Sequence, residues 1–585
     1  MSRYNSSDIA GTMEVALGKK PASMLIKNGK LINVYSGKIE DNISIAIYKN
    51  RFAYIGDLSN ILIDEDTSII DANGAYIMPG FIDAHTHLDS IFQLGEYAKY
   101  AILSGNTTAI TETAMIANSF GYKGVLYFME DAKNLPMRIF FLVPSLVPPF
   151  KGFETSRDFS FEHFKMIANH PNVVGVGETY WHRAVGFDER VSNQFEIAHE
   201  YNLTMEGHAA GAHNKKLQAY KAAGISSCHE SISLEDAVER LRLGMAVMIR
   251  EGYIRQDFSS IYPIKDLGMD LRRVMLVSDL FEPAFMIEKG GMNILVREAI
   301  EYGFDLVTAV QMVTINPAQY FCLRDLGGIA PGNLADLVIV DDPKEMRCRL
   351  VIMDGEVVAE DGKLTKEPPK HKYPDDSYHS VKIRKTKPED FFINKKDGLY
   401  KIRCVDVVNE TITHELVVSH KAVNGNLASD IEKDILKMAV IDKGHPDLRM
   451  AIGFVHGMGL KRGAIADSLI WDTSNIFVVG VDESDISYAV NRLIELQGGY
   501  VVVENGEILA EMPLPVCGIT SDKSFEEIAY EIKKVELACT HLGFKPTRPY
   551  LVLQTISFTG LPFIRLTDKG LIDTKEGKML NLIVD

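Results

Sequence analysis

Hydrophobic and polar positions alternate in two different ways along the 585-residue chain. From residue 22 to 77, short apolar runs are separated by turn dipeptides such as Asn-Gly and Ser-Gly, which is typical of β-hairpins. The same style returns at residues 334–364, in "LADLVIVDD" and "LVIMDGEVVAEDGKL". Because the two pieces flank one central region, we expect residues 1–77 and 326–370 to form one composite β-sandwich domain.

The central region, residues 78–325, alternates apolar runs with amphipathic helical segments. The pattern predicts eight strands, at residues 80–87, 107–111, 137–143, 173–178, 203–208, 225–229, 246–250 and 274–279. Repeated strand–helix units favour a parallel sheet with right-handed crossovers, and eight units in roughly 250 residues fit a closed (β/α)₈ barrel. An open, doubly wound sheet is the alternative, but no glycine-rich nucleotide-binding motif follows the first strand.

The remainder of the chain predicts a third unit. Residues 371–390 are polar and rich in lysine and proline, which is typical of a linker. Residues 391–585 combine apolar strands such as "IFVVGVD" with an amphipathic helical segment, so we expect a C-terminal α/β domain. The whole chain is therefore assigned to the α/β class.

Charge and cysteine content exclude several classes of partner. The formal net charge is -17, from 79 acidic and 62 basic residues, which disfavours binding to a nucleic-acid backbone. No apolar stretch approaches the roughly 20 residues needed to span a bilayer. The six cysteines are scattered without Cys-x-x-Cys spacing, so a disulfide framework is not expected. We expect a cytoplasmic homo-oligomer that acts on a small molecule and binds neither nucleic acid nor membrane.

Two histidines stand one residue apart at the end of the first barrel strand, in "MPGFIDAHTHLDS". Side chains of a strand alternate between its faces, so His85 and His87 share one face and are suited to hold a metal ion. Two ordinary histidines near a turn would give the same local pattern. The rest of the barrel decides between these interpretations.

Four further residues with side chains that commonly bind metals stand at the ends of other strands. They are Glu178, His208, His229 and Asp279. Barrel enzymes build their active sites on this rim, and imidazoles together with carboxylates hold zinc, manganese or iron. We expect two divalent ions per chain, bridged by the carboxylate of the fourth strand. A bound ion lowers the pKa of water to about 7, and Asp279 is predicted to be both a ligand and the general base.

The chain resembles a known group of enzymes, the amidohydrolase superfamily and, within it, the bacterial and archaeal adenine deaminases. The resemblance rests on "PGFIDAHTHLDS", "VGVGETYW", "EGHAAG", "CHESISLEDAVERLRLGMAVMIREG" and "TINPAQYFCLRDLGGIAPGNLADLVIVDD", with "GLKRGAIADS" further on. It implies a barrel with a composite β domain, a binuclear metal centre, and hydrolysis of adenine to hypoxanthine and ammonia.

The chain departs from the family pattern in three places. The family's Asp-Pro-His-Glu is replaced by residues 112–115, so that Met115 stands where the family has an acid. The loop after the eighth strand contains Phe281 in "SDLFEP", and Trp471 and Ser474 replace two histidines in "WDTSN". The retained ligands with altered neighbours predict a hydrolase whose pocket is more apolar near Met115 and Phe281, and whose substrate differs from that of ordinary members.

Other residues are candidates for contact with the substrate. Glu112 follows the second strand and is predicted to replace the missing acid as a proton donor. Arg250 ends the seventh strand and either holds an anionic or carbonyl group of the substrate or forms a structural ion pair. His182 in "YWHR" follows the fourth strand and either meets the substrate or is a loop histidine without a role in the site.

Three functions are compatible with these residues. The first is deamination of adenine or a close purine analogue by metal-activated hydroxide. The alternative is a cyclic-amide hydrolase that opens the ring of an oxopurine or a related nitrogen heterocycle at the same metal site. A non-enzymatic binding protein on the same fold is the third, and the complete ligand set argues against it.

Overall fold

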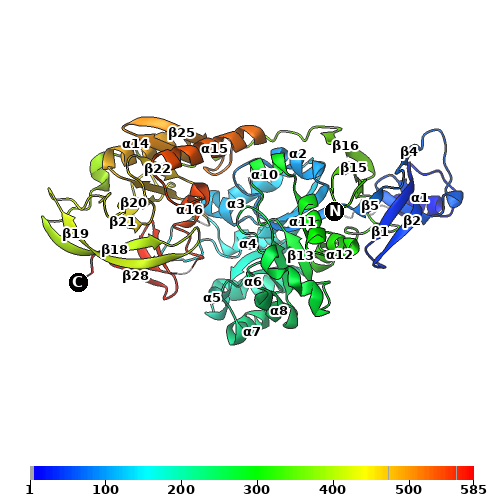
Figure 1. Cartoon of the computed structure of the whole chain (residues 1–585), viewed down its shortest axis with the longest axis horizontal. Helices are drawn as coiled ribbons and strands as arrows, with labels where there is room; N and C mark the ends of the chain where they lie inside the picture. The colour runs from blue at the N-terminus through cyan, green and yellow to red at the C-terminus, as the bar shows by residue number, and fades with distance from the viewer. Residues whose placement is uncertain (1–5, 472, 562, 585) are drawn as a thin grey trace.

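The computed structural model describes residues 6–471, 473–561 and 563–584. Figure 1 shows three units in a row, with the N-terminal sheet at one end, the barrel in the middle and the C-terminal domain at the other end. None of the described helices is both long and apolar enough to cross a membrane.

The composite β domain is one nine-stranded sheet built from two distant parts of the chain. Its first part contributes β1 (Met24–Asn33), β2 (Lys38–Tyr48), β3 (Arg51–Gly56), β4 (Ser68–Asp71) and β5 (Tyr76–Pro79). Its second part contributes β14 (Leu337–Val340), β15 (Cys348–Met353), β16 (Glu356–Glu360) and β17 (Lys363–Leu364). The antiparallel pair β5–β14 joins the parts, and Ile45 of β2 and Ile352 of β15 share one core, so the sheet folds over on itself.

The barrel contains all eight predicted strands. They are β6 (Phe81–Thr86), β7 (Asn106–Thr111), β8 (Arg138–Val143), β9 (Val173–Tyr180), β10 (Thr204–His208), β11 (Ser227–Cys228), β12 (Ala246–Arg250) and β13 (Val274–Val277). They form two parallel arcs, β6 to β10 and β11 to β13. The Ser226 N–H donates to the Met205 carbonyl oxygen (2.9 Å) and the Asp279 N–H to that of His85 (3.1 Å), which closes the arcs into a barrel. The predicted barrel is confirmed.

Helices follow most strands and cover the outside of the barrel. The longer ones are α2 (Leu94–Leu103), α3 (Ala114–Asp131), α4 (Phe161–Ala168), α6 (Glu189–Glu200), α7 (Asn214–Ala222), α8 (Leu234–Arg242) and α11 (Met292–Glu301). Helix α8 is amphipathic, with Ala237 buried on one face and charged residues on the other. The short helix α5 (Trp181–Val185) follows β9 directly, and α10 (Pro283–Glu288) follows β13.

The C-terminal domain is a second large sheet covered by helices. Its eight strands are β18 (Gly398–Val407), β19 (Thr413–Ala422), β20 (Ile435–Ile441), β21 (Met450–His456), β22 (Ala464–Asp467), β23 (Ile476–Gly480), β24 (Gly499–Glu504) and β25 (Glu507–Pro513). The helices are α14 (Glu483–Leu496), α15 (Phe525–His541) and α16 (Pro549–Thr555), and a small sheet of β26 (Ile564–Thr567), β27 (Gly570–Asp573) and β28 (Lys578–Leu580) follows.

Buried polar contacts fix the C-terminal domain to the barrel. The Lys443 Nζ donates to the Ser119 Oγ of α3 (2.7 Å), and the guanidinium of Arg157 pairs with Asp442 (2.7 Å). The intervening residues 371–390 pack against the barrel too, since the Tyr373 hydroxyl donates to Asp131 (3.0 Å). The domain is thereby held over the rim on which the predicted metal ligands stand.

Candidate metal centre and active site

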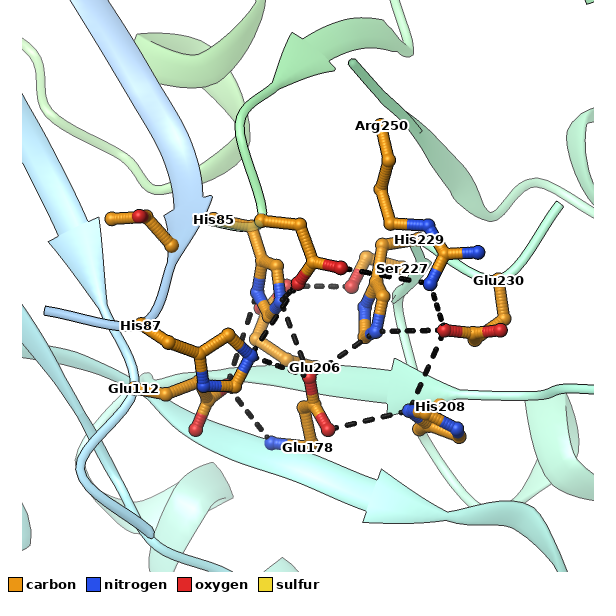
Figure 2. A network of polar contacts seen from close by, with 12 residues as sticks. His85, His87, Glu112, Glu178, Glu206, His208, Ser227, His229, Glu230 and Arg250 are labelled. Carbon is orange, nitrogen blue, oxygen red and sulfur yellow. Dashed lines mark hydrogen bonds and ion pairs between the residues drawn. The ribbon is translucent and has the colours of Figure 1, made fainter. Parts of the chain in front are cut away.

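Four histidines surround the carboxylate of Glu178 on the rim of the barrel (Figure 2). The Glu178 Oε1 lies 3.2 Å from the Nε2 atoms of His85, His87 and His229. Its Oε2 lies 3.3 Å from the Nδ1 of His208. These residues come from the ends of β6, β9, β10 and β11, so one carboxylate contacts imidazoles from three other strands.

The sixth predicted ligand, Asp279, reaches the cluster from the turn after β13. Its Oδ1 lies 3.2 Å from the Nε2 of His85 and 3.4 Å from that of His87. The backbone of Asp279 is left-handed, with a φ of 59°, a conformation that aspartate adopts more readily than most residues. The preceding Ser278 is held by hydrogen bonds from its Oγ (2.5 Å) and N–H (3.2 Å) to Asp83, which fixes the turn.

The donor set has the chemistry of a site for divalent cations. The ligand atoms of His85, Glu178, His229 and Asp279 all lie within 4.8 Å of one another. Both ring nitrogens of His85 and of His208, and the Oδ1 of Asp279, are buried without a hydrogen-bond partner among the described residues. A buried polar atom without a partner costs about 1–3 kcal/mol, and a cation removes that cost by accepting the lone pairs. Imidazole and carboxylate ligands fit zinc, manganese or iron.

The charges of the cluster are strongly coupled. Burial alone would lower the pKa of His85, but the contacts with Asp279 and Glu178 raise the pKa to about 10. Burial would raise the pKa of both carboxylates, yet the surrounding histidines hold the pKa of Asp279 and of Glu178 well below the usual range. In the absence of a cation, protons on the imidazoles therefore neutralise the two carboxylates. Binding of a metal ion must displace these protons.

A further acidic residue, Glu230, lies beside the cluster and is not among the predicted site residues. Its Oε1 is 3.5 Å from the Nε2 of His229 and 3.9 Å from the Nδ1 of His208, and it forms an ion pair with Arg250. Strand alternation would point the side chain of Glu230 away from that of its neighbour His229. However, β11 ends at Cys228, so the two adjacent side chains are free to point the same way.

Arg250 of β12 is the hub of the ion pairs at this side of the site. Figure 2 shows its contact with Glu230. Its guanidinium also pairs with Asp257 (2.8 Å) and lies 3.6 Å from the Oδ2 of Asp279. Of the two roles predicted for Arg250, the structure shows the ion pair, and the side chain also faces the cavity described next.

A cavity of about 90 Å³ opens above the cluster, between the barrel and the C-terminal domain. Its floor includes His87, Glu178, His208, His229, Glu230, Arg250 and Asp279. Its other walls are Ile254 and Arg255 of the barrel and Thr411, Trp471, Thr555, Phe558 and Leu561 of the C-terminal domain. The Trp471 ring meets the His87 ring edge-on, with centroids 4.7 Å apart. The C-terminal domain thus supplies a largely apolar roof.

Three residues predicted to contact the substrate do not line this cavity. Met115 is buried in the core, where its N–H donates to Asp89 (2.8 Å). Phe281 stacks on Phe285 of α10 (5.6 Å), because the loop after β13 turns directly into that helix. His182 lies on α5 and stacks on the ring of Tyr180. The Tyr180 ring in turn meets the His208 ring edge-on. Proximity in sequence to a strand end did not give these side chains the direction expected of them.

Glu112 lies behind the cluster rather than in the cavity. Its Oε1 accepts a hydrogen bond from the Glu178 N–H (3.0 Å) and lies 3.9 Å from the Nδ1 of His85. Burial and the nearby charge of Glu178 raise the pKa of Glu112 to about 8, so it carries a proton at neutral pH. From this position Glu112 supports Glu178 and is separated from the cavity by the residues of the cluster. The structure does not support its predicted role as a donor to the substrate.

Comparison with known proteins agrees with this geometry. Residues 76–358 match the model of the amidohydrolase family, and residues 410–578 match that of the adenine deaminase C-terminal domain. The chain belongs to the amidohydrolase family. As a member of it, the chain is a metal-dependent hydrolase.

Curated relatives match over nearly the full length. Adenine deaminase of Moorella thermoacetica is 37% identical over 97% of both chains, and adenine deaminase of Kosmotoga olearia is 33% identical over 99% of both. Adenine deaminase of Staphylothermus marinus is 35% identical over 99% of this chain and 98% of its own.

Solved structures are similar over part of the chain. A β-aspartyl dipeptidase of Fervidobacterium islandicum AW-1 covers 59% of this chain and 99% of its own, with a TM-score of 0.46 and 19% identity. A D-hydantoinase of Thermus sp. covers 59% and 97%, with a TM-score of 0.45 and 16% identity.

The support given by Glu112 leads to a prediction about stability. Glu112→Gln keeps an oxygen that accepts from the Glu178 N–H and replaces a group that is already neutral, so we expect the free energy of unfolding to change by less than about 1 kcal/mol. Glu112→Ala removes the acceptor and leaves a cavity, and we expect a loss of about 2–4 kcal/mol. Urea denaturation of chelator-treated protein measures both. Equal losses in the two variants would contradict the supporting role.

Proposed function

We propose that this enzyme hydrolyses adenine to hypoxanthine and ammonia at the rim site around Glu178. The observation that carries the proposal is the convergence of four buried histidines and two carboxylates beneath a cavity with an apolar roof. The relatives that match over nearly the full length are named adenine deaminases, which favours deamination over the opening of a ring amide.

We assign two divalent ions to the site, with zinc, manganese and iron as the candidates. His85, His87 and Asp279 form one half of the cluster, His208 and His229 the other, and Glu178 contacts histidines of both halves. When bound, the ions supply Lewis acidity and lower the pKa of water, which prepares it for attack on the ring carbon that bears the amino group.

The chain's own residues then handle protons. The carboxylate of Asp279 is the group placed to accept a proton at the cluster, because it is buried at the cavity floor and ionised. Arg250, 3.6 Å from its Oδ2, stabilises the ionised form and fixes its direction. A proton held there can be returned to the amino group, which leaves as ammonia.

The roof excludes water and shapes the pocket. Trp471, Phe558 and Leu561 present apolar surface to the side of the cavity opposite the cluster. A flat heteroaromatic ring is the kind of ligand that such surfaces accept, and a dry pocket strengthens the electrostatic interactions on its floor.

The reaction itself can be tested directly. Protein produced in medium supplemented with manganese, iron or zinc is incubated with adenine, and ammonia and hypoxanthine are quantified separately. We expect the two products in equal amounts, with the purine ring intact by chromatography. Failure to release ammonia from adenine with every metal, or release of a ring-opened product, would overturn the proposal.

The role of Asp279 gives a second prediction. Asp279→Asn keeps the size of the side chain and an oxygen for coordination but cannot accept a proton. General-base catalysis contributes typically 10²–10⁴-fold, so we expect kcat to fall by about that factor. Elemental analysis should find most of the metal retained, which separates loss of the base from loss of the site. A metal-loaded variant with a normal kcat would contradict the assignment.

A further inference from the structure

The carboxylate of Glu230 has one oxygen that the polar cluster does not use. Among the described residues, the polar contacts of this side chain all go through Oε1, which faces Arg250, His229 and His208. Figure 2 shows the dashed contacts converging on that one oxygen, with the other turned away from them. The side chain lines the cavity and is 13% exposed. Its Oε2 is therefore available to a ligand.

Each oxygen of the other two carboxylates on the cavity floor lies within 3.6 Å of a histidine or arginine nitrogen of the cluster. Glu178 contacts histidines through both oxygens. Asp279 contacts His85 through Oδ1 and faces Arg250 through Oδ2. Among the described residues that line the cavity, Glu230 is thus the carboxylate left to recognise a ligand.

Arg250 fixes the direction of this acceptor. Its guanidinium is held on the far side by two contacts with Asp257, at 2.8 and 2.9 Å, and on the near side by Glu230. An ionised carboxylate accepts hydrogen bonds and donates none, so the group it recognises must be an N–H or O–H. The roof of Trp471, Phe558 and Leu561 restricts the ligand to a flat, largely apolar body.

We propose that Glu230 binds a ring N–H of the heterocycle through Oε2, and that this contact orients the ring over the cluster. The identity of the ring rests on the proposed function. Glu230 is in this view a substrate-binding residue that distinguishes a free base from a ring alkylated at nitrogen, because alkylation removes the donor and leaves the charged acceptor unpaired.

The test compares adenine with 9-methyladenine and 7-methyladenine, neither of which has a ring N–H. Dissociation constants are measured by calorimetry on metal-loaded Asp279→Asn protein, in which turnover is suppressed, with Glu230 intact or replaced in Glu230→Gln. A hydrogen bond to a charged group corresponds to at least about tenfold in affinity. With Glu230 present, we expect adenine to bind at least about tenfold more tightly than either methylated base. Glu230→Gln should weaken the binding of adenine and bring the ratio of the dissociation constants of methylated and free base to within about threefold.

A matched control separates contact with the ligand from loss of the ion pair. Asp257→Asn weakens the hold on Arg250 but leaves Glu230 in place, so the variant should keep the preference for adenine. An equal loss of preference in Asp257→Asn would show that Glu230 acts only through Arg250. Loss of bound metal in Glu230→Gln would make it a metal ligand, and an unchanged ratio would mean that the methyl group merely clashes. Each of these results overturns the proposal.

The outcome for Glu230 is distinguishable from the outcome for the proposed function. If adenine binds with the expected preference but intact protein releases no ammonia, the deamination proposal fails and the recognition by Glu230 stands. If intact protein releases ammonia and the preference for adenine is unchanged in Glu230→Gln, the deamination proposal stands and the recognition by Glu230 fails. Absence of any adenine binding overturns both.

Discussion

The contact of one buried carboxylate with four imidazoles is the constraint on which the rest of the molecule depends. Glu178 lies within 3.3 Å of His85, His87, His208 and His229 in the interior of the protein. Burial of ionised groups is costly unless they are paired, so these residues are stable only while the barrel holds them together. The closed ring of parallel strands supplies that rigidity, because each strand fixes the position of its neighbour's last residue. The barrel therefore serves as the frame for a cluster of charges.

The C-terminal domain completes the site that the barrel begins. The barrel rim contributes nearly all of the polar groups, and the roof residues Trp471, Phe558 and Leu561 come from the other domain. Lys443, buried and bonded to Ser119 of α3, is part of the contact that keeps this roof in place. The proposed substrate pocket thus lies at the junction of two domains, whereas the candidate metal ligands all belong to one. Changes in the C-terminal domain can consequently alter the pocket while the cluster stays intact.

Strand periodicity explains which parts of the site the sequence predicts. A strand's last residues face the rim whatever follows them, so His85 of β6 and His208 of β10 could be placed from the ends of apolar runs alone. Glu230 escaped because it follows His229 beyond the end of β11, where alternation no longer decides direction. Met115, Phe281 and His182 were misplaced because each belongs to a helix or loop whose direction is set by packing partners distant in sequence. The roof could not be predicted either, since it depends on how two domains meet.

The most direct test of this account is anomalous diffraction from crystals of the metal-loaded protein, recorded at the absorption edge of the bound metal. The account predicts two strong peaks on either side of the Glu178 carboxylate. One should lie at coordination distance, about 2.0–2.3 Å, from ligand atoms of His85, His87 and Asp279, and the other from those of His208 and His229. Crystals of metal-saturated protein in which these six side chains hold no anomalous scatterer, or in which the metal lies elsewhere, would contradict it.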